Sequence, residues 1–154
     1  MSVATKELCL VPVQPDKAGL LKELFVEMAK TIELRHPVSA KESDIRENFL
    51  SGEPGLAWFI NFDGEIVGYV TGYTGINSSR AQPILFIDDI YLKESARRRG
   101  LGEKVIDELK TIAKGLACRE LRWQALKTNV GAQRFYQKIR ADKSDAAIDY
   151  AISL

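Results

Sequence analysis

The stretch Ile-Leu-Phe-Ile-Asp-Asp-Ile-Tyr-Leu (residues 84–92) is followed closely by Arg-Arg-Arg-Gly-Leu-Gly (residues 97–102). The first stretch is rich in β-branched and aromatic residues and predicts a central strand. The second predicts a short turn and then a helix that begins at Leu101. The first turn of a helix offers unpaired N–H groups and a positive dipole end, and glycine lets an anion approach that backbone closely. The junction therefore predicts a phosphate site that suits a pyrophosphate.

Two common glycine-loop patterns do not match this loop. The dinucleotide fingerprint needs a third glycine three positions after Gly102, where Val105 stands. The nucleotide-triphosphate loop needs Gly-Lys followed by Ser or Thr, and the chain lacks that tripeptide. The structural alternative is a solvated basic turn in which the glycines only allow the chain to turn and bind no ligand.

Apolar spacing on both sides of this junction predicts alternating strands and helices. Strands are expected at residues 8–13, 56–62, 65–73, 83–92, 119–126 and 147–153, and helices at 16–32, 43–50, 101–116 and 130–138. Asp16 and Ser43 are the expected N-caps, and Asp63-Gly64 predicts a hairpin turn. A looser loop is expected at residues 75–82. The order of strand, long helix and strand around residues 101–116 predicts a right-handed crossover and a parallel strand pair.

Composition limits the kinds of partner. With 154 residues, of which 45% are hydrophobic and 28% charged, the chain is sized for one domain over residues 1–154. The 22 basic and 21 acidic side chains leave a net charge of +1, which provides no broad field for nucleic acid. The arginine run is therefore interpreted as a local anion clamp, and nucleic-acid binding is a minor alternative. No secretory leader or long apolar span is recognised, so a cytoplasmic protein without a membrane partner is expected.

The cysteine and histidine content predicts no metal site. Cys9 and Cys118 are the only cysteines, and they stand with a single histidine, too few for the usual zinc clusters. Both are expected to be reduced core residues, although a disulfide between them stays open from the sequence.

Two spaced motifs connect the chain to a known family. Arg97-x-x-Gly100-x-Gly102 resembles the Q/R-x-x-G-x-G/A loop of the GCN5-related N-acetyltransferase (GNAT) family, and Asn129-x-x-Ala132-x-x-Phe135-Tyr136 is similar to that family's second signature. Residues 86–92 look like the central strand of the diamine and polyamine N-acetyltransferases within it. The resemblance implies an α/β (α+β) GNAT fold, with a mixed central sheet of about six to seven strands and about four helices.

The resemblance also implies acetyl-CoA as the acyl donor, with no metal. Main-chain groups of Ile90 and Leu92 are expected to pair with the pantetheine arm, and residues 98–102 to hold the pyrophosphate. Arg97 or Arg98 is a further candidate for the 3′-phosphate. The full set expected at coenzyme A is Ile90, Tyr91, Leu92, Arg97, Arg98, Arg99, Gly100, Leu101, Gly102, Asn129, Ala132 and Tyr136.

Catalysis on an amine requires a base, because an unperturbed alkylammonium has a pKa of roughly 10.4. Asp88 and Asp89 are the candidates, and strand alternation places them on opposite faces unless a bulge re-aims the chain. Asp88 is favoured because it aligns with the family's acidic position, and it would act through a water molecule. Tyr136 is the expected acid for the departing thiolate. The structural alternatives are aspartates paired with a nearby cation and a tyrosine that only packs in the core.

The leading hypothesis is an enzyme that moves an acetyl group from acetyl-CoA to a primary amine of a small molecule, by direct attack in a ternary complex. A homodimer is expected by family analogy. Acetylation of a protein or peptide amine or of an aminoglycoside, and a non-catalytic acyl-CoA-binding module, are the alternatives. The chain departs from the family pattern at two places. Arg140 stands where the family commonly has glycine, which weakens the prediction of the usual turn at that helix end. Residues 33–37 read Glu-Leu-Arg-His-Pro in place of an acidic amine-binding loop, which weakens the prediction of a polyamine substrate.

Overall fold

The computed structural model describes residues 7–32 and 37–154. This part of the chain divides into two compact units, and the boundary in the sequence falls between Gln124 and Ala125. The loop expected to bind amines, residues 33–37, lies outside the described residues except for Pro37. The elements of the chain are β1 (Leu8–Pro12), η1 (Pro15–Lys17), α1 (Ala18–Thr31), α2 (Glu42–Phe49), β2 (Leu56–Phe62), β3 (Glu65–Asn77), β4 (Gln82–Leu92), η2 (Glu94–Ala96), α3 (Leu101–Gly115), β5 (Glu120–Trp123) and α4 (Val130–Lys138).

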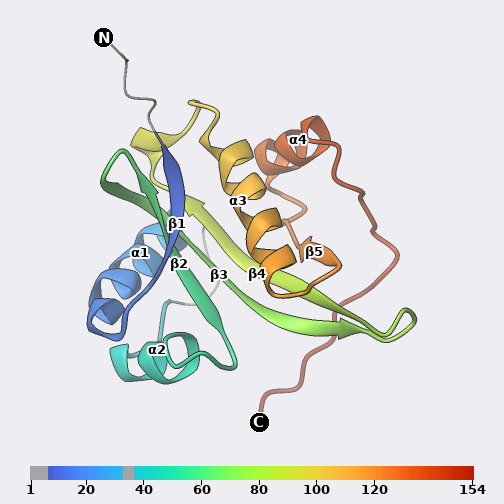
Figure 1. The fold of residues 1–154 in the computed structure, drawn as a ribbon, viewed down its shortest axis with the longest axis horizontal. Coiled ribbons are helices and arrows are strands. Elements are labelled where there is room, and N and C mark those ends of the chain that lie inside the picture. The colour runs from blue at the N-terminus through green and yellow to red at the C-terminus, as the bar shows by residue number, and fades with distance from the viewer. Residues whose placement is uncertain (1–6, 33–36) are drawn as a thin grey trace. The chain divides into compact units, whose positions relative to one another are not determined.

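The first unit is built on one mixed sheet (Figure 1). Its strand order is β1-β2-β3-β4-β5; the first four strands are antiparallel neighbours, and β4 pairs with β5 in parallel. The mixed α/β class and the parallel pair are confirmed. The expected strand count of about six to seven is too high for the described chain, which has five strands.

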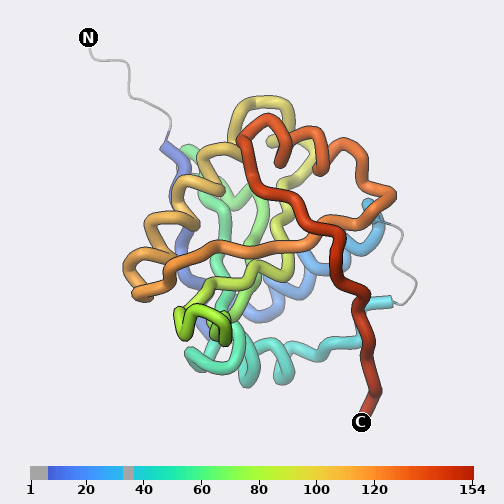
Figure 2. The backbone as a smooth tube through the Cα atoms, turned by 90° about the vertical axis from the view of Figure 1, so that its right-hand side faces the viewer, coloured from blue at the N-terminus to red at the C-terminus, as the bar shows by residue number. Residues whose placement is uncertain are grey.

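Helices cover both faces of this sheet, as Figure 2 shows. The face toward α1 and α2 carries a core cluster to which α1, α2, β2, β3 and β4 all contribute. Its buried members are Val13, Ala18, Leu21, Leu24, Ile45, Ala57, Phe59, Tyr69 and Tyr91. The opposite face is covered by α3, whose buried stripe is Leu101, Val105, Ile106, Leu109 and Ala113. Burial of each large apolar side chain contributes about 1.5–3 kcal/mol to the stability of the fold. This packing fixes α3 on the sheet and with it the position of the helix N-terminus that follows the arginine loop.

A β-bulge interrupts β4 at the aspartate pair. Thr71 of β3 pairs with Asp89, whereas the next residue, Gly72, pairs with Ile87, so Asp88 is one extra residue on β4. A bulge breaks strict alternation and re-aims the side chains around it. Simple alternation along residues 84–92 therefore does not describe where the two carboxylates point.

Three local expectations are wrong. Asp16 lies inside the short helix η1, and Ser43 lies inside α2, where the Asp44 carboxylate instead accepts a hydrogen bond from the Lys41 backbone N–H, 2.8 Å away. The expected loop at 75–82 is shorter, because β3 continues to Asn77 and pairs with β4 along its whole second half. Cross-strand pairing thus extended a segment whose Gly and Asn residues suggested a turn.

The second unit contains α4, which has defined caps at both ends. The Asn129 side chain accepts a hydrogen bond from the Ala132 N–H at 3.1 Å. At the other end Arg140 has a φ of +60°, and the Ala141 and Arg140 N–H groups donate to the Tyr136 and Gln137 carbonyls, which is the Schellman arrangement. Residues 147–153, predicted to be a strand, have no regular structure.

The cysteines are both free. Cys118 is buried as expected, but Cys9, which lies on the edge strand β1, is exposed. Among the described residues, no helix is long and apolar enough to cross a membrane.

Candidate active site

The loop before α3 presents backbone donors to solvent. Gly100 is the N-cap of α3, with a φ of +72°, and no side chain caps the first turn of the helix. A Cβ atom added at Gly100 would have no neighbour within 4 Å, so the space above this residue is open. The unpaired N–H groups, the helix dipole and the exposed Arg98 and Arg99 side chains form a setting that suits a phosphate.

The Arg97 side chain is turned back toward β4. Its Nε donates to the Leu92 carbonyl at 2.8 Å, and its guanidinium lies over the Tyr91 ring, 5.8 Å from the centroid. Arg97 therefore links the loop to the end of β4. Arg97 and Arg98 are the two arginines expected near a 3′-phosphate. Of these two, only the Arg97 side chain donates a hydrogen bond to the protein backbone among the described contacts, so Arg98 is the better placed.

The second half of β4 has one unpaired edge. The parallel pairing with β5 runs only from Ile84 to Ile87, and no other described strand pairs with that side of β4. The Lys93 N–H donates to the Val67 carbonyl of β3, so by alternation the backbone groups of Ile90 and Leu92 point away from β3. This edge is available for an extended ligand that adds to the sheet as a strand does.

The two aspartates have different surroundings. Asp88, on the bulge, is exposed. Asp89 is half-buried, and its Oδ2 accepts a hydrogen bond from the Tyr69 hydroxyl at 3.1 Å. The pKa of Asp89 is raised to about 6, chiefly because the carboxyl is buried and also because of the charge of Asp88, while the Tyr69 hydrogen bond acts in the opposite direction and lowers it. A carboxylate that titrates this close to neutrality is typical of functional sites.

Further polar groups surround this carboxylate on the α1 side of the sheet. The Tyr69 hydroxyl also lies 3.2 Å from the sulfur of Met28 in α1. The Tyr91 hydroxyl donates to Glu27 Oε2, also in α1, at 3.3 Å. Thr71 is 1% exposed, and its hydroxyl oxygen is buried without a hydrogen-bond partner among the described residues. A buried polar atom left unpaired costs about 1–3 kcal/mol, so this one is a candidate for a functional role.

In the second unit, Tyr136 and Asn129 belong to α4 and its cap. Tyr136 is half-buried, and burial raises the pKa of its phenol, which keeps it protonated at neutral pH. Asn129 Oδ1 caps the helix, and the amide NH₂ of Asn129 offers two donors for a ligand. Ala132 donates its N–H to that cap and is half-buried.

The sequence profile of the acetyltransferase (GNAT) family matches residues 21–141. The chain belongs to this family. GNAT enzymes take the acetyl group from acetyl-CoA, so the protein is an acetyl-CoA-dependent N-acetyltransferase, as the motifs indicated.

Individual relatives of this acetyltransferase act on different amines, to judge from their names. Thialysine N-epsilon-acetyltransferase from Bos taurus is 26% identical over 132 residues, covering 80% of this chain and 77% of that protein. Aminoglycoside N(6′)-acetyltransferase type 1 from Serratia marcescens is 26% identical over 95 residues, covering 60% of this chain and 65% of that protein.

Two solved structures confirm the fold. An aminoglycoside acetyltransferase, meta-AAC0020 from an uncultured soil metagenomic sample, solved in complex with trehalose, has a TM-score of 0.78 at 17% identity, with 96% of both chains covered. Aminoglycoside N-acetyltransferase AAC(6′)-Iy in complex with CoA has a TM-score of 0.74 at 18% identity, with 100% of both chains covered.

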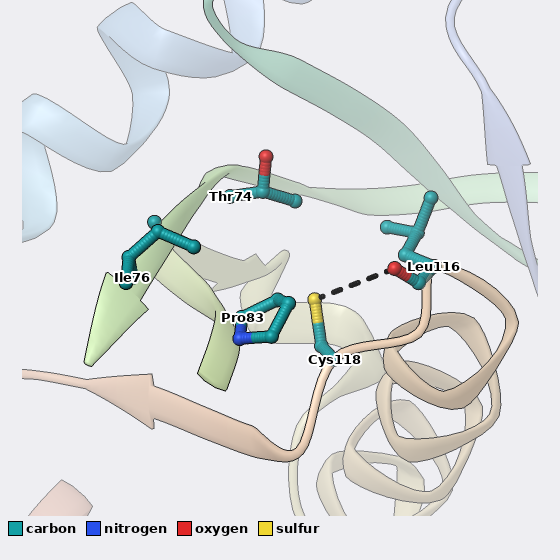
Figure 3. A pocket seen from close by; sticks show the side chains of 6 residues that line it. Thr74, Ile76, Pro83, Leu116 and Cys118 are labelled. Carbon is teal, nitrogen blue, oxygen red and sulfur yellow. Dashed lines mark hydrogen bonds between the residues drawn. The ribbon is translucent and has the colours of Figure 1, made fainter. Parts of the chain in front are cut away.

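A shallow hollow on the first unit of this acetyltransferase lies away from the arginine loop (Figure 3). It has a volume of about 340 Å³ and is lined by Thr74, Gly75, Ile76, Pro83, Leu116 and Cys118. Pro83 lies at the opposite end of β4 from the arginine loop, and nine residues of strand separate it from Leu92 by about 30 Å. The hollow therefore carries none of the proposed chemistry.

Sequence reasoning missed Tyr69, Thr71 and Glu27. Each stands in an apolar or amphipathic run that is typical of an ordinary core strand or helix surface. Only the β3–β4 register and the packing of α1 place these residues near Asp89 and Tyr91. A buried tyrosine usually needs a partner for its hydroxyl, and that rule is the one available signal. Within the described residues, no group of three His, Cys, Asp or Glu side chains could hold a metal ion.

Proposed function

We propose that this acetyltransferase moves the acetyl group to a primary amine of a small molecule, by direct attack of the amine within a ternary complex. The observation that carries the proposal is a row of backbone groups in the first unit that could hold acetyl-CoA along its length. The uncapped start of α3 and the open space above Gly100 lie beyond one end of β4. The unpaired edge of that strand then leads back to the carboxylates at the bulge.

The residues present suit acetyl-CoA as donor. The α3 N–H groups from residue 101 onward, with Arg98 and Arg99, would hold the diphosphate by charge-assisted hydrogen bonds. The backbone of Ile90 and Leu92 would hold the pantetheine arm through strand-like hydrogen bonds, although the Leu92 carbonyl already accepts from Arg97. When bound, acetyl-CoA supplies an activated thioester carbonyl.

The chain's own groups then handle protons. A carboxylate of the Asp88–Asp89 pair accepts a proton from the attacking amine nitrogen, directly or through a water molecule, which frees the lone pair for the new C–N bond. Tyr136 donates a hydrogen bond or a proton to the sulfur as the C–S bond breaks. The raised pKa of its phenol supports this role, because a donor must keep its proton at neutral pH.

A small-molecule acceptor is supported by the names of the relatives, which refer to thialysine, aminoglycosides and ornithine. Loops set specificity on a shared fold, so the same fold serves acceptors of different kinds. An aminoglycoside is the second candidate acceptor, since such enzymes recur among the relatives in both sequence and structure.

The test has two stages. Acetyl-CoA is expected to raise the thermal unfolding temperature, since a ligand that binds only the folded state stabilises it. Release of free thiol is then measured with a panel of monoamines, diamines, amino acids and aminoglycosides. The absence of any thermal shift would remove the donor site from the proposal, and a shift without thiol release from any acceptor would favour a non-catalytic acyl-CoA-binding module.

We also propose a single catalytic domain, on the basis of chain length, a cytoplasmic location, on the basis of the sequence pattern, and a homodimer, on the basis of family resemblance. Sedimentation at several protein concentrations tests the dimer, and a monomer at every concentration would contradict it.

A further inference from the structure

Two hydroxyl-bearing residues of β3 lie on the same face of the sheet as Asp89. Tyr69 and Thr71 are two residues apart on the strand, so their side chains lie on the same face of the sheet. Thr71 lies directly opposite Asp89 in the register, a position in which Cβ atoms are about 4.5–5.5 Å apart. The Tyr69 hydroxyl donates to Asp89 Oδ2 at 3.1 Å. We call Tyr69 and Thr71 the hydroxyl pair.

The two members of the hydroxyl pair are used differently. Tyr69 is 0% exposed and already bonded, whereas the Thr71 hydroxyl is equally buried and has no partner among the described residues. If the role of the Thr71 hydroxyl were to donate its proton to the Asp89 carboxylate, the hydrogen bond would be expected in the resting structure. Its remaining use is as an acceptor, which becomes possible only when the facing carboxyl group carries a proton.

We propose that Tyr69 and Thr71 are positioning residues that make Asp89, rather than Asp88, the group that accepts the amine proton. This inference rests on the proposed function and deepens it. It reverses the preference expected from the sequence, because Asp88 on the bulge is exposed, whereas Asp89 is half-buried, accepts a hydrogen bond from Tyr69 and lies opposite Thr71 in the strand register.

The proton transfer balances as follows. The attacking nitrogen gives one N–H proton to Asp89, whose carboxylate becomes a carboxylic acid, and forms a bond to the acetyl carbon. The C–S bond to coenzyme A breaks, and the departing sulfur takes its proton from Tyr136, which solvent then reprotonates. Tyr69 continues to donate to Oδ2, and the new O–H donates to Thr71 Oγ1. The proton then leaves to solvent past the exposed Asp88, and the carboxylate is restored for the next turnover.

Other charged groups near Asp89 come from each packed element. Asp88 and Tyr91 lie on β4 itself, Tyr69 lies on β3, and Glu27 of α1 reaches the Tyr91 hydroxyl. Ile45 and Phe49 of α2 contribute only apolar contacts on this face. The Arg97 guanidinium lies over the Tyr91 ring. Burial is the main reason why the pKa of Asp89 is raised, and Asp88 is the charged group that raises it further.

The experiment compares the pH profile of kcat in full-length variants, from about pH 5 to about pH 9, with the acceptor that the panel identifies. Asp89→Asn is expected to lower kcat about 100-fold or more, as loss of a general base does. Tyr69→Phe removes the bond that lowers the pKa of Asp89 and should move the acid limb to higher pH. Asp88→Asn removes a charge that raises it and should move the acid limb to lower pH.

Thr71→Val distinguishes a functional hydroxyl from an accidental one. Valine has nearly the same shape, and removing an unpaired buried hydroxyl should leave the unfolding temperature unchanged or raise it. The proposal expects kcat nevertheless to fall about tenfold, the effect of one lost hydrogen bond. Thr74→Val and Tyr73→Phe, at exposed positions of the same strand, are the matched controls and should leave both quantities unchanged.

A second readout does not depend on turnover. Carboxyl ¹³C NMR of aspartate-labelled protein without substrate follows the titration of Asp89 directly, and Tyr69→Phe should move it upward. If Asp88→Asn abolishes turnover while Asp89→Asn does not, or if Thr71→Val leaves kcat unchanged, the inference is overturned although the acetyltransferase function stands. If neither the wild type nor any variant releases thiol, the proposed function fails. The NMR result is then judged separately: if Tyr69→Phe does not change the pKa of Asp89, the proposed role of the hydroxyl pair is overturned as well.

Discussion

Gly100 carries the most specific single-residue requirement in the donor loop. Its φ of +72° lies in the region that costs most residues about 1–2 kcal/mol, and the space above it is open. A side chain there would both strain the backbone and occupy the volume expected to receive the diphosphate.

Gly100→Val is therefore expected to weaken acetyl-CoA binding at least about tenfold, measured by calorimetry. Gly115→Ala is the matched control, because Gly115 lies at the other end of the same helix with open space around it and no positive φ. A lower unfolding temperature with unchanged acetyl-CoA affinity would show that Gly100 serves the backbone alone.

Tyr136 is the residue whose role is chemical in the proposal. Tyr136→Phe keeps the ring and removes the donor, so kcat is expected to fall about 100-fold while the dissociation constant of acetyl-CoA stays nearly constant. Tyr150→Phe, at an exposed tyrosine of the same unit, is the control. An unchanged kcat in Tyr136→Phe would remove the acid assignment.

The end of α4 shows how an element can keep its geometry with an unfavourable residue. The family commonly has glycine at the position of Arg140, and here an arginine adopts the same left-handed conformation, with a φ of +60°. The two Schellman hydrogen bonds to Tyr136 and Gln137 hold it there. The departure in sequence therefore does not alter the turn.

Arg140→Gly should stabilise the protein by about 0.5–1 kcal/mol, because glycine adopts positive φ without steric cost and this gain exceeds the entropy it loses on folding. Urea unfolding monitored by circular dichroism measures the change. Arg134→Gly, inside the same helix, should instead destabilise by about 1 kcal/mol. A loss of stability in Arg140→Gly would mean that the arginine side chain contributes more than its backbone strain costs.

At the scale of the whole molecule, the half-buried Asp89 links folding to pH. Its pKa is raised from the model-compound value of 3.8 to about 6 in the folded state, so the folded protein binds the proton more tightly than the unfolded chain does. The resulting stability is fully present below about pH 4 and is lost as the pH rises through about 6.

Asp89→Asn removes this linkage. The free energy of unfolding of the variant minus that of the wild type should be about 1–3 kcal/mol larger at pH 7 than at pH 4. A value near the lower figure is expected because the carboxyl is partly exposed. Denaturant unfolding at the two pH values measures the difference, and the wild type supplies the contribution of all other carboxylates. A difference that does not vary with pH would mean that Asp89 titrates normally in the folded protein.

Local patterns were enough to predict much of this protein. The apolar run at 84–92, the Arg97–Gly102 turn and the stripe of α3 indicated the strand, loop and helix, and the second motif at Asn129–Tyr136 indicated the family. These features depend on residues close together in the chain, where backbone preference, helix-end polarity and side-chain period act directly.

The arrangement of Asp88 and Asp89 could not be predicted in the same way. The extra residue at Asp88, the meeting of Tyr69 and Thr71 with Asp89, and the exposure of Cys9 all depend on which strand lies beside which and in what register. Register reflects the packing of entire faces of the sheet against α1 and α3, so a one-residue bulge changes the surroundings of a side chain without leaving a local mark in the sequence.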